Sequence, residues 1–320
     1  MTTSWYWWGI FAGFVTLLLV SDLGISRRSQ NVMNLSTALC ATGLRVGLAL
    51  LFNAGIYLGW MGEYETRQLQ HSAGLEFLTS YLVELALSID NVFVFALIFR
   101  HFRVDASSQH RVLFWGILGA LVMRGFMIFV GLQILHLFHW VTYLFGIALI
   151  VAGIRMLAHS ENHSSAENSL VERWVRRILP ISEGFHGSSF FIRNNHMLLA
   201  TPLLVVLMVI ETTDLIFALD SIPAVLAVTH DGFIILTSNI FAILGLRAMY
   251  FALADLIDRF HFLHYGLSAI LAFIGSKMLL SDTPFRIGTM QSLFVILIFL
   301  IVSIVASLAI PKRKEQTPAP

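Results

Sequence analysis

Carboxylates inside apolar segments are the residues of this sequence whose type and spacing point to chemistry. The stretch Glu211-Thr-Thr-Asp214-Leu-Ile-Phe-Ala-Leu-Asp220-Ser-Ile-Pro223 places three acids within an apolar run that extends from Leu198 to Val228. An ionised carboxylate near the centre of a bilayer costs roughly 2.5–3.5 kcal/mol, so acids in a membrane helix are expected to serve a function. The alternative is a buried helix of a water-soluble protein with paired acids.

Composition argues against a water-soluble protein. Hydrophobic residues make up 57% of the 320 positions and charged residues 12%, whereas a soluble domain carries about 25% charged residues. Segments of eighteen or more mostly apolar residues recur, and each is long enough to span a bilayer. We therefore expect an all-α polytopic membrane protein with about nine transmembrane helices, at about 5–23, 36–60, 75–99, 112–136, 140–158, 199–222, 233–254, 264–281 and 289–310.

Other compositional features exclude several classes of protein. The net charge is +1 and there is no basic stripe with interleaved aromatic residues, so we expect no nucleic-acid partner. The one cysteine, Cys40, excludes an intrachain disulfide and a cysteine-based zinc cluster. The N-terminal stretch Trp5-Tyr-Trp-Trp8 lacks the basic region of a signal peptide, which indicates an uncleaved first span.

Basic residues near the span ends predict the orientation in the membrane. Fourteen arginines and lysines fall in the flanks of one side, and only Arg67 and Arg286 fall on the other. Because cytoplasmic flanks are enriched in basic residues, we expect the N-terminus outside and the C-terminus in the cytoplasm.

Two related units make up most of the chain, which we interpret as one integral membrane domain over 1–320. Glu84-Leu-Ala-Leu-Ser-Ile-Asp90-Asn91 resembles Asp214-Leu-Ile-Phe-Ala-Leu-Asp220-Ser221, and the following spans carry Arg124 and Arg247 at a similar offset. The alternative is chance similarity between apolar helices. Each unit has three spans, and an odd number predicts opposite orientations, as in the inverted repeats of secondary transporters.

The predicted segments follow from this repeat. They are peripheral helices at 5–60, repeat one at 75–158, a cytoplasmic loop at 159–198, repeat two at 199–281, a last helix at 289–310 and a tail at 311–320. Within the loop, Ser169 and Glu172 have the spacing of a capping box, which predicts an amphipathic helix on the membrane surface.

Helical spacing brings part of each acidic motif to one face. Glu84, Ser88 and Asn91 stand at i, i+4 and i+7. Asp90 and Asp220 lie six residues after their partner acids and point about 120° away on an ideal helix. They would join the same site only if the helix were distorted, and Pro223 supplies a cause in one repeat.

The polar residues of these spans predict a site for a hard divalent cation. Five acids and two arginines leave a formal charge of −3 in an apolar interior, which requires protons or a cation. Oxygen ligands suit magnesium, calcium or manganese, and adjacent acids would release protons when a metal binds. We predict no permanently bound cofactor and a transported cation held by Glu84, Asp90, Asn91, Glu211, Asp214 and Asp220, with support from Ser88, Ser221, Arg124, Arg247 and Asn239.

Glu211 is the acid that departs from the repeat, since the matching position of the first motif is Tyr81. We therefore expect it to break the symmetry of the site and to contribute to ion selectivity.

These motifs resemble those of the TerC family, together with Thr201-Pro and Thr237-Ser-Asn-Ile-Phe-Ala-Ile-Leu-Gly-Leu-Arg247. The resemblance covers roughly residues 5–310 and is greatest to the Alx-like bacterial branch. It implies a bacterial inner-membrane protein of the LysE-type transporter superfamily, with manganese export in the Alx-like branch and tellurite resistance in other members. The family's acids carry over onto Glu84, Asp90, Glu211, Asp214 and Asp220.

Three functions are compatible with these features. The first is a manganese exporter, coupled to protons and not an enzyme. The second is a membrane scaffold or insertion factor of the TerC type, which leaves the interior carboxylates unexplained. The third is an intramembrane aspartyl protease, but its Gly-x-Gly-Asp signature is absent. The sequence leaves the oligomeric state open.

Overall fold

A computed structural model describes residues 5–28, 35–61, 64–138, 140–158, 180–182, 184–194, 197–253 and 262–309. The predicted amphipathic helix after Ser169 lies outside the described residues. Within them the elements are α1 (Trp5–Arg28), α2 (Leu35–Tyr57), α3 (Arg67–His101), α4 (Ala106–Leu137), α5 (Val141–Ala158), β1 (Phe191–Asn194), β2 (Met197–Ala200), α7 (Pro202–Leu226), α8 (Gly232–Leu253), α9 (Leu263–Leu279) and α10 (Thr289–Ala309).

The nine helices of the described residues confirm the predicted helical membrane architecture. Six are long and apolar enough to cross a bilayer, namely α2, α3, α4, α7, α8 and α10. The apolar parts of α1, α5 and α9 are shorter, at 10–17 residues. Several bounds differ from the predicted spans. The largest difference is at α3, which begins at Arg67 because Thr66 caps it by accepting a hydrogen bond from the backbone N–H of Leu69.

Pro223 lies inside α7 and does not end it. The helix continues to Leu226, and the N–H of Ala227 still donates to the carbonyl oxygen of Pro223 at 3.0 Å. Proline removes one backbone donor, so its effect is confined to the preceding turn. The distortion that we considered for bringing Asp220 toward Asp214 is therefore not an unwound segment.

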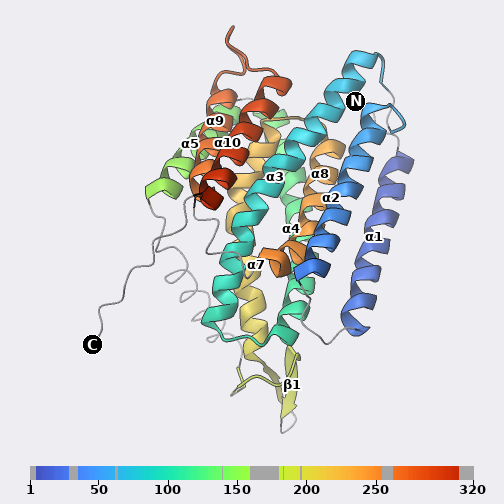
Figure 1. The fold of residues 1–320 in the computed structure, drawn as a ribbon, viewed down its shortest axis with the longest axis vertical. Helices are drawn as coiled ribbons and strands as arrows, with labels where there is room; N and C mark the ends of the chain where they lie inside the picture. The colour runs from blue at the N-terminus through green and yellow to red at the C-terminus, as the bar shows by residue number, and fades with distance from the viewer. Residues whose placement is uncertain are drawn as a thin grey trace.

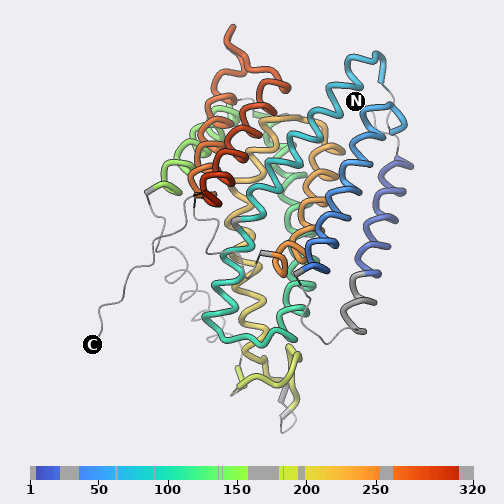
Figure 2. The backbone as a smooth tube through the Cα atoms, in the orientation of Figure 1, coloured from blue at the N-terminus to red at the C-terminus, as the bar shows by residue number. Residues whose placement is uncertain are grey.

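The helices form one bundle, with α1 and α2 along one side and α5, α9 and α10 along the other (Figure 1). The central helices α3, α4, α7 and α8 pack against one another, and α2 also packs on α8. The tube view shows α3 running from one end of the bundle to the other (Figure 2). The apolar core between α2, α3 and α8 is rich in aromatic rings, among them Phe52, Phe77 and Phe241.

The contacts between the two predicted repeats are reciprocal. Repeat one comprises α3, α4 and α5, and repeat two comprises α7, α8 and α9. The first helix of each packs on the second helix of the other, as α3 with α8 and α4 with α7, and the third helices α5 and α9 pack together. An approximate two-fold axis would produce this pattern. The inverted repeat itself stays a prediction.

The crossing of α5 and α9 depends on glycines. A Cβ on Gly146 would lie 3.0 Å from the carbonyl oxygen of Gly275, and one on Gly153 would lie 2.8 Å from that of Ser268. Ser268 also donates a hydrogen bond to the carbonyl oxygen of Gly153. The two helices approach this closely because small residues expose their backbones to each other.

A β-hairpin lies at one end of the bundle, which we call the hairpin end, and the opposite end is called the far end (Figure 1). Strands β1 and β2 pair antiparallel at the end of the predicted cytoplasmic loop 159–198, and β2 continues to Ala200, into the predicted span 199–222. Arg111, in the first turns of α4, donates to Ser188 and lies over the ring of Phe190 at 5.0 Å. Thr201, the residue before α7, donates to the carbonyl oxygen of Ser189 at 2.6 Å. The hairpin thereby ties α4 to α7.

Candidate cation site

Two carboxylates and one guanidinium meet at half the length of the central helices. Glu84 is the middle residue of α3, Asp214 is the middle residue of α7, and Arg124 lies near the middle of α4. All three side chains are buried, with exposed fractions of 0% for Glu84, 1% for Arg124 and 4% for Asp214. The sequence predicted Glu84, Asp214 and Arg124 as members of one site, and the structure brings them together.

Arg124 is bonded on several sides. Its Nε donates to Oδ2 of Asp214 at 3.1 Å and its Nη2 donates to Oδ1 at 2.9 Å, which makes a bidentate pair. Its Nη1 donates to Oε1 of Glu84 and to Oγ of Ser221, the latter at 3.2 Å. A buried charge is tolerated only when such bonds compensate for the lost hydration. The guanidinium therefore supplies hydrogen bonds and a counter-charge to both carboxylates in the bundle interior.

Asn91 completes the contacts of Asp214. Its amide Nδ2 donates to Oδ1 of that residue at 3.3 Å. Asn91 and Ser221 hold matching positions in the two motifs, and both lie against the Glu84–Arg124–Asp214 cluster. This cluster, with Asn91, Ser221 and the buried Ser88 one turn after Glu84 on α3, is called the central cluster below.

Some polar atoms of the central cluster lack a partner. Oε2 of Glu84 and Oγ of Ser88 are fully buried and have no hydrogen bond among the described residues. Buried polar atoms in folded proteins are nearly always bonded to protein or water. These two unsatisfied oxygens, one helical turn apart, are therefore available to bind a small ligand.

Asp220 lies beside the central cluster, on the edge of a small cavity. The cavity has a volume of about 20 Å3 and is lined by Asn91, Asp220 and Ser221 together with apolar side chains of α3, α5, α7 and α9. A volume of this size holds one water molecule or one small ion. Asp220 thus reaches the same neighbourhood as Asp214 without any unwinding of α7.

Glu211 faces α4 one turn before Asp214. A Cβ placed on Gly119 would collide with its carboxylate, so this glycine provides the space that the side chain occupies. Oε2 of Glu211 has no hydrogen bond among the described residues. The sequence identified this acid but gave no sign of the α4 glycine that accommodates it.

No contact with the central cluster is described for three further predicted members, Arg247, Asn239 and Asp90. The guanidinium of Arg247 lies 3.3 Å from Nδ1 of His110, near the hairpin end of α4. Asn239 is buried in α8, and its Nδ2 lacks a hydrogen bond among the described residues. The backbone of Asp90 belongs to α3, but its side chain lies outside what the structure describes.

The described residues contain no group of three His, Cys, Asp or Glu side chains that is arranged to hold a metal. Arg124 stands between Glu84 and Asp214 and is bonded to one oxygen of Glu84 and to both oxygens of Asp214. The predicted six-ligand set stays a prediction, because the side chain of Asp90 lies outside what the structure describes.

Comparison with known proteins agrees with these features. Residues 69–315 match the model of the integral membrane protein TerC family. An uncharacterized membrane protein of Myxococcus xanthus is 46% identical over 301 residues, which cover 94% of this chain and 91% of the relative. A Photorhabdus laumondii protein, whose name proposes a membrane-bound redox modulator, Alx, is 45% identical over 276 residues, or 86% of each chain. No solved structure matches the chain significantly.

The family model spans most of the chain, including the helices α3, α4 and α7 that build the central cluster. The descriptions of the family and of these relatives name membrane proteins and no enzyme. The chain belongs to the TerC family of integral membrane proteins.

Proposed function

We propose that this protein is a secondary transporter that exports a hard divalent cation, most consistently manganese, across the bacterial inner membrane. The observation that carries this proposal is the central cluster. Two buried carboxylates share one guanidinium there, at half the length of the central helices. Oε2 of Glu84 and Oγ of Ser88 have no hydrogen bond among the described residues. Its partners are the metal ion, as substrate, and the lipid bilayer.

Charge balance supports a divalent substrate coupled to protons. Glu84, Asp214, Asp220 and Glu211 would carry −4 if all were ionised, and Arg124 carries +1, which leaves −3. One divalent cation and one proton together neutralise this charge. Carboxylates that share protons and a metal release the protons when the metal binds, which gives a natural route to antiport.

Arg124 acts in this scheme as the cation that holds the site when substrate is absent. A divalent ion that binds both Glu84 and Asp214 must displace the guanidinium, and the two cations would then alternate on the same oxygens. Carboxylate, amide and hydroxyl oxygens suit manganese and magnesium better than zinc or copper.

Two other functions are the alternatives against which the transport experiment is judged. The first is a membrane scaffold or insertion factor, which the central cluster does not explain. The second is the redox role in the name of the relatives; here the one cysteine, Cys40, cannot form an intrachain disulfide.

Purified protein in liposomes with a trapped manganese indicator tests the proposal. We expect manganese uptake that depends on a pH gradient, and loss of uptake in Asp214→Asn and Asp220→Asn variants. Asp105→Asn is the matched control, because Asp105 is exposed and makes no side-chain cap bond to α4. Competition with magnesium and calcium measures selectivity. If the wild type gave no uptake under any gradient, the scaffold interpretation would replace transport. Full-rate uptake in the Asp214 variant would remove the central cluster from the mechanism.

A further inference from the structure

Oxygen-bearing side chains recur at every fourth residue along α3. Starting near the far end, they are Gln68, Ser72, Glu76, Ser80, Glu84 and Ser88. Residues four apart are neighbours on a helix, each step rising about 6 Å and turning about 40°, so they form an inclined ridge. We call these six side chains the α3 oxygen row. It begins far from the central cluster and ends within it.

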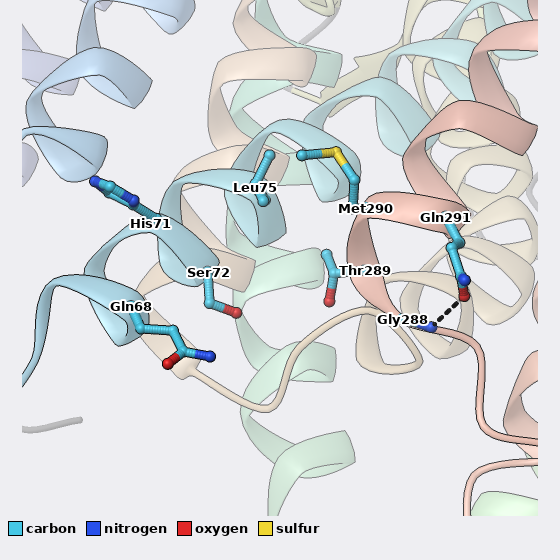
Figure 3. Close-up of a pocket in the computed structure, with 8 residues that line it drawn as sticks. All are labelled: Gln68, His71, Ser72, Leu75, Gly288, Thr289, Met290 and Gln291. Carbon is cyan, nitrogen blue, oxygen red and sulfur yellow. Dashed lines mark hydrogen bonds between the residues drawn. The ribbon is translucent and has the colours of Figure 1, made fainter.

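The outer end of the row opens into a pocket. The pocket is lined by residues of α3, among them Gln68 and Ser72, and by residues at the start of α10, among them Thr289 (Figure 3). The pocket has a volume of about 720 Å3. It is much larger than one ion, so a cation could enter it with its hydration shell.

Glu76 links this pocket to the interior. Its Oε1 accepts a hydrogen bond from Ser72, which lines the pocket, at 3.0 Å, and its Oε2 accepts one from Thr229 at 2.7 Å. Burial and the negative charges of Asp231 and Glu76 raise the pKa of the neighbouring Tyr64 to about 12. The carboxylates of Glu76 and Asp231 and the hydroxyls of Ser72 and Thr229 lie just inside the pocket, and Lys277 is a neighbouring cation of Glu76. Carboxylate and hydroxyl oxygens are ligands that suit a hard cation.

The inner steps of the row are buried and unsatisfied. Oγ of Ser80, Oε2 of Glu84 and Oγ of Ser88 have no hydrogen bond among the described residues. Thr79 makes a useful contrast, because it is equally buried and its Oγ1 donates to the carbonyl oxygen of Leu75 at 2.7 Å. A hydroxyl that serves only packing in a membrane helix usually makes such a bond to its own backbone, and Ser80 does not.

Helix packing alone does not account for the row. Small residues at spacing four allow close helix contact, but Glu76 and Glu84 are not small. The corresponding positions of the second motif, 130 residues later, are Pro202 for Ser72, Val206 for Glu76 and Ile210 for Ser80. Val206 and Ile210 are buried and apolar. Equivalent positions in α7 thus pack without oxygen atoms.

We infer that the α3 oxygen row is the path by which a divalent cation passes between the far-end pocket and the central cluster, with Glu76 as the intermediate carboxylate. This inference rests on the proposed transport function and adds the side of the bundle on which the site opens. Ser80 and Glu84 are fully buried here, so the path is closed between them in this conformation and opens when α3 moves against its neighbours.

Cysteine accessibility tests the row residue by residue. In a Cys40→Ser background, the variants Ser72→Cys, Ser80→Cys and Thr79→Cys are reconstituted in liposomes. A membrane-impermeant cationic thiol reagent is then added from either side. From the far-end side we expect Ser72→Cys to react fastest and Ser80→Cys to react about tenfold faster than Thr79→Cys. Saturating manganese should slow the reaction at Ser80→Cys, and labelling there should block manganese flux.

The outcomes separate this inference from the proposed function. Two results would reject the α3 oxygen row as the cation path: equal labelling rates at Ser80→Cys and Thr79→Cys, or normal manganese flux after complete labelling of Ser80→Cys. Manganese flux in the wild type would still support transport in either case. Absence of flux in the wild type would instead remove the transport function. As a second variant, Glu76→Gln should raise the half-saturating manganese concentration when the ion is supplied at the far end. An unchanged value would exclude Glu76 as an intermediate ligand.

Discussion

At the scale of single residues, the side chain that governs the central cluster is Arg124. Two neighbouring helices supply its hydrogen-bond acceptors, since Glu84 comes from α3 and Asp214 and Ser221 from α7. Removing one partner of a buried ion pair leaves the other charge uncompensated in a low-dielectric interior, and this costs more than the pair contributes. Arg124 therefore stabilises the two buried acids, and it also competes with a metal ion for their oxygens.

We predict that Arg124→Gln lowers the free energy of unfolding by about 3–5 kcal/mol, because Glu84 and Asp214 lose their common counter-charge. Unfolding in detergent micelles measures this change. Arg111→Gln is the control, since Arg111 is exposed and its guanidinium contacts Ser188 and Phe190 just before β1. Adding Asp214→Asn to Arg124→Gln should recover part of the loss, as a double-mutant cycle shows for coupled residues. Strictly additive effects would mean that the two side chains do not interact.

We also predict that Gly119→Ala destabilises the protein by about 1 kcal/mol, because the new methyl group overlaps the Glu211 carboxylate and forces this flexible side chain into another rotamer. Gly125→Ala is the matched control on the same helix, since its nearest neighbour would be 3.8 Å away. Combining Gly119→Ala with Glu211→Ala should remove the penalty. If Gly119→Ala behaved like the control in thermal unfolding, the carboxylate would lie elsewhere.

The sequence predicted much of this site, and its failures have physical causes. Glu84, Asp214, Asn91 and Ser221 were identifiable because polar groups in apolar helices are costly and the two motifs repeat. The position of Arg247 near His110 was not predictable. Arg124 and Arg247 follow the two acidic motifs at similar distances along the chain, but this spacing does not determine which neighbour a long side chain reaches. Unpartnered oxygens such as that of Ser80 become visible only when the surrounding atoms are known.

At the scale of helices and strands, hydropathy predicted where the chain crosses the membrane but not how the ends are built. The start of α3 depends on the Thr66 cap, outside the apolar segment. The β-hairpin was missed because a few residues of Phe191–Asn194 and Met197–Ala200 give a weak pattern beside long apolar runs. The sequence suggested Pro223 as a possible cause of helix distortion, whereas α7 continues past it to Leu226.

The α5–α9 crossing yields a prediction at this scale. Gly275→Ala would place a methyl group against the backbone of Gly146 and against Ile150, so we expect the two helices to separate and the melting temperature to fall by several degrees. Gly245→Ala in α8 is the control, because nothing lies within 4 Å of its Cβ position. A melting temperature for Gly275→Ala equal to or above that of the control would contradict the close crossing.

At the scale of the whole molecule, the arrangement separates two ends with different chemistry. The far end carries the pocket between α3 and α10 together with Arg67, and the hairpin end carries Arg100, Arg103 and Arg111. Basic residues favour the cytoplasmic side, so the hairpin end is expected in the cytoplasm and the far-end pocket outside.

This orientation predicts opposite labelling of two single-cysteine variants. In a Cys40→Ser background, Ser72→Cys at the far end should react with an impermeant thiol reagent added to intact cells. Arg193→Cys in β1 should react only after the membrane is opened. Labelling of both from outside would mean a mixed orientation, and the reverse pattern would place the hairpin outside and turn the proposed export into uptake.

The β-hairpin has a mechanical consequence for the bundle. It is fastened to the first turns of α4 through Arg111 and to the entry of α7 through Thr201. Because α4 and α7 are linked at the hairpin end, a change in the angle between them would move their hairpin-end residues least. The separation between Arg124 and Asp214 then changes as the helices tilt, and the largest displacement falls at the far end.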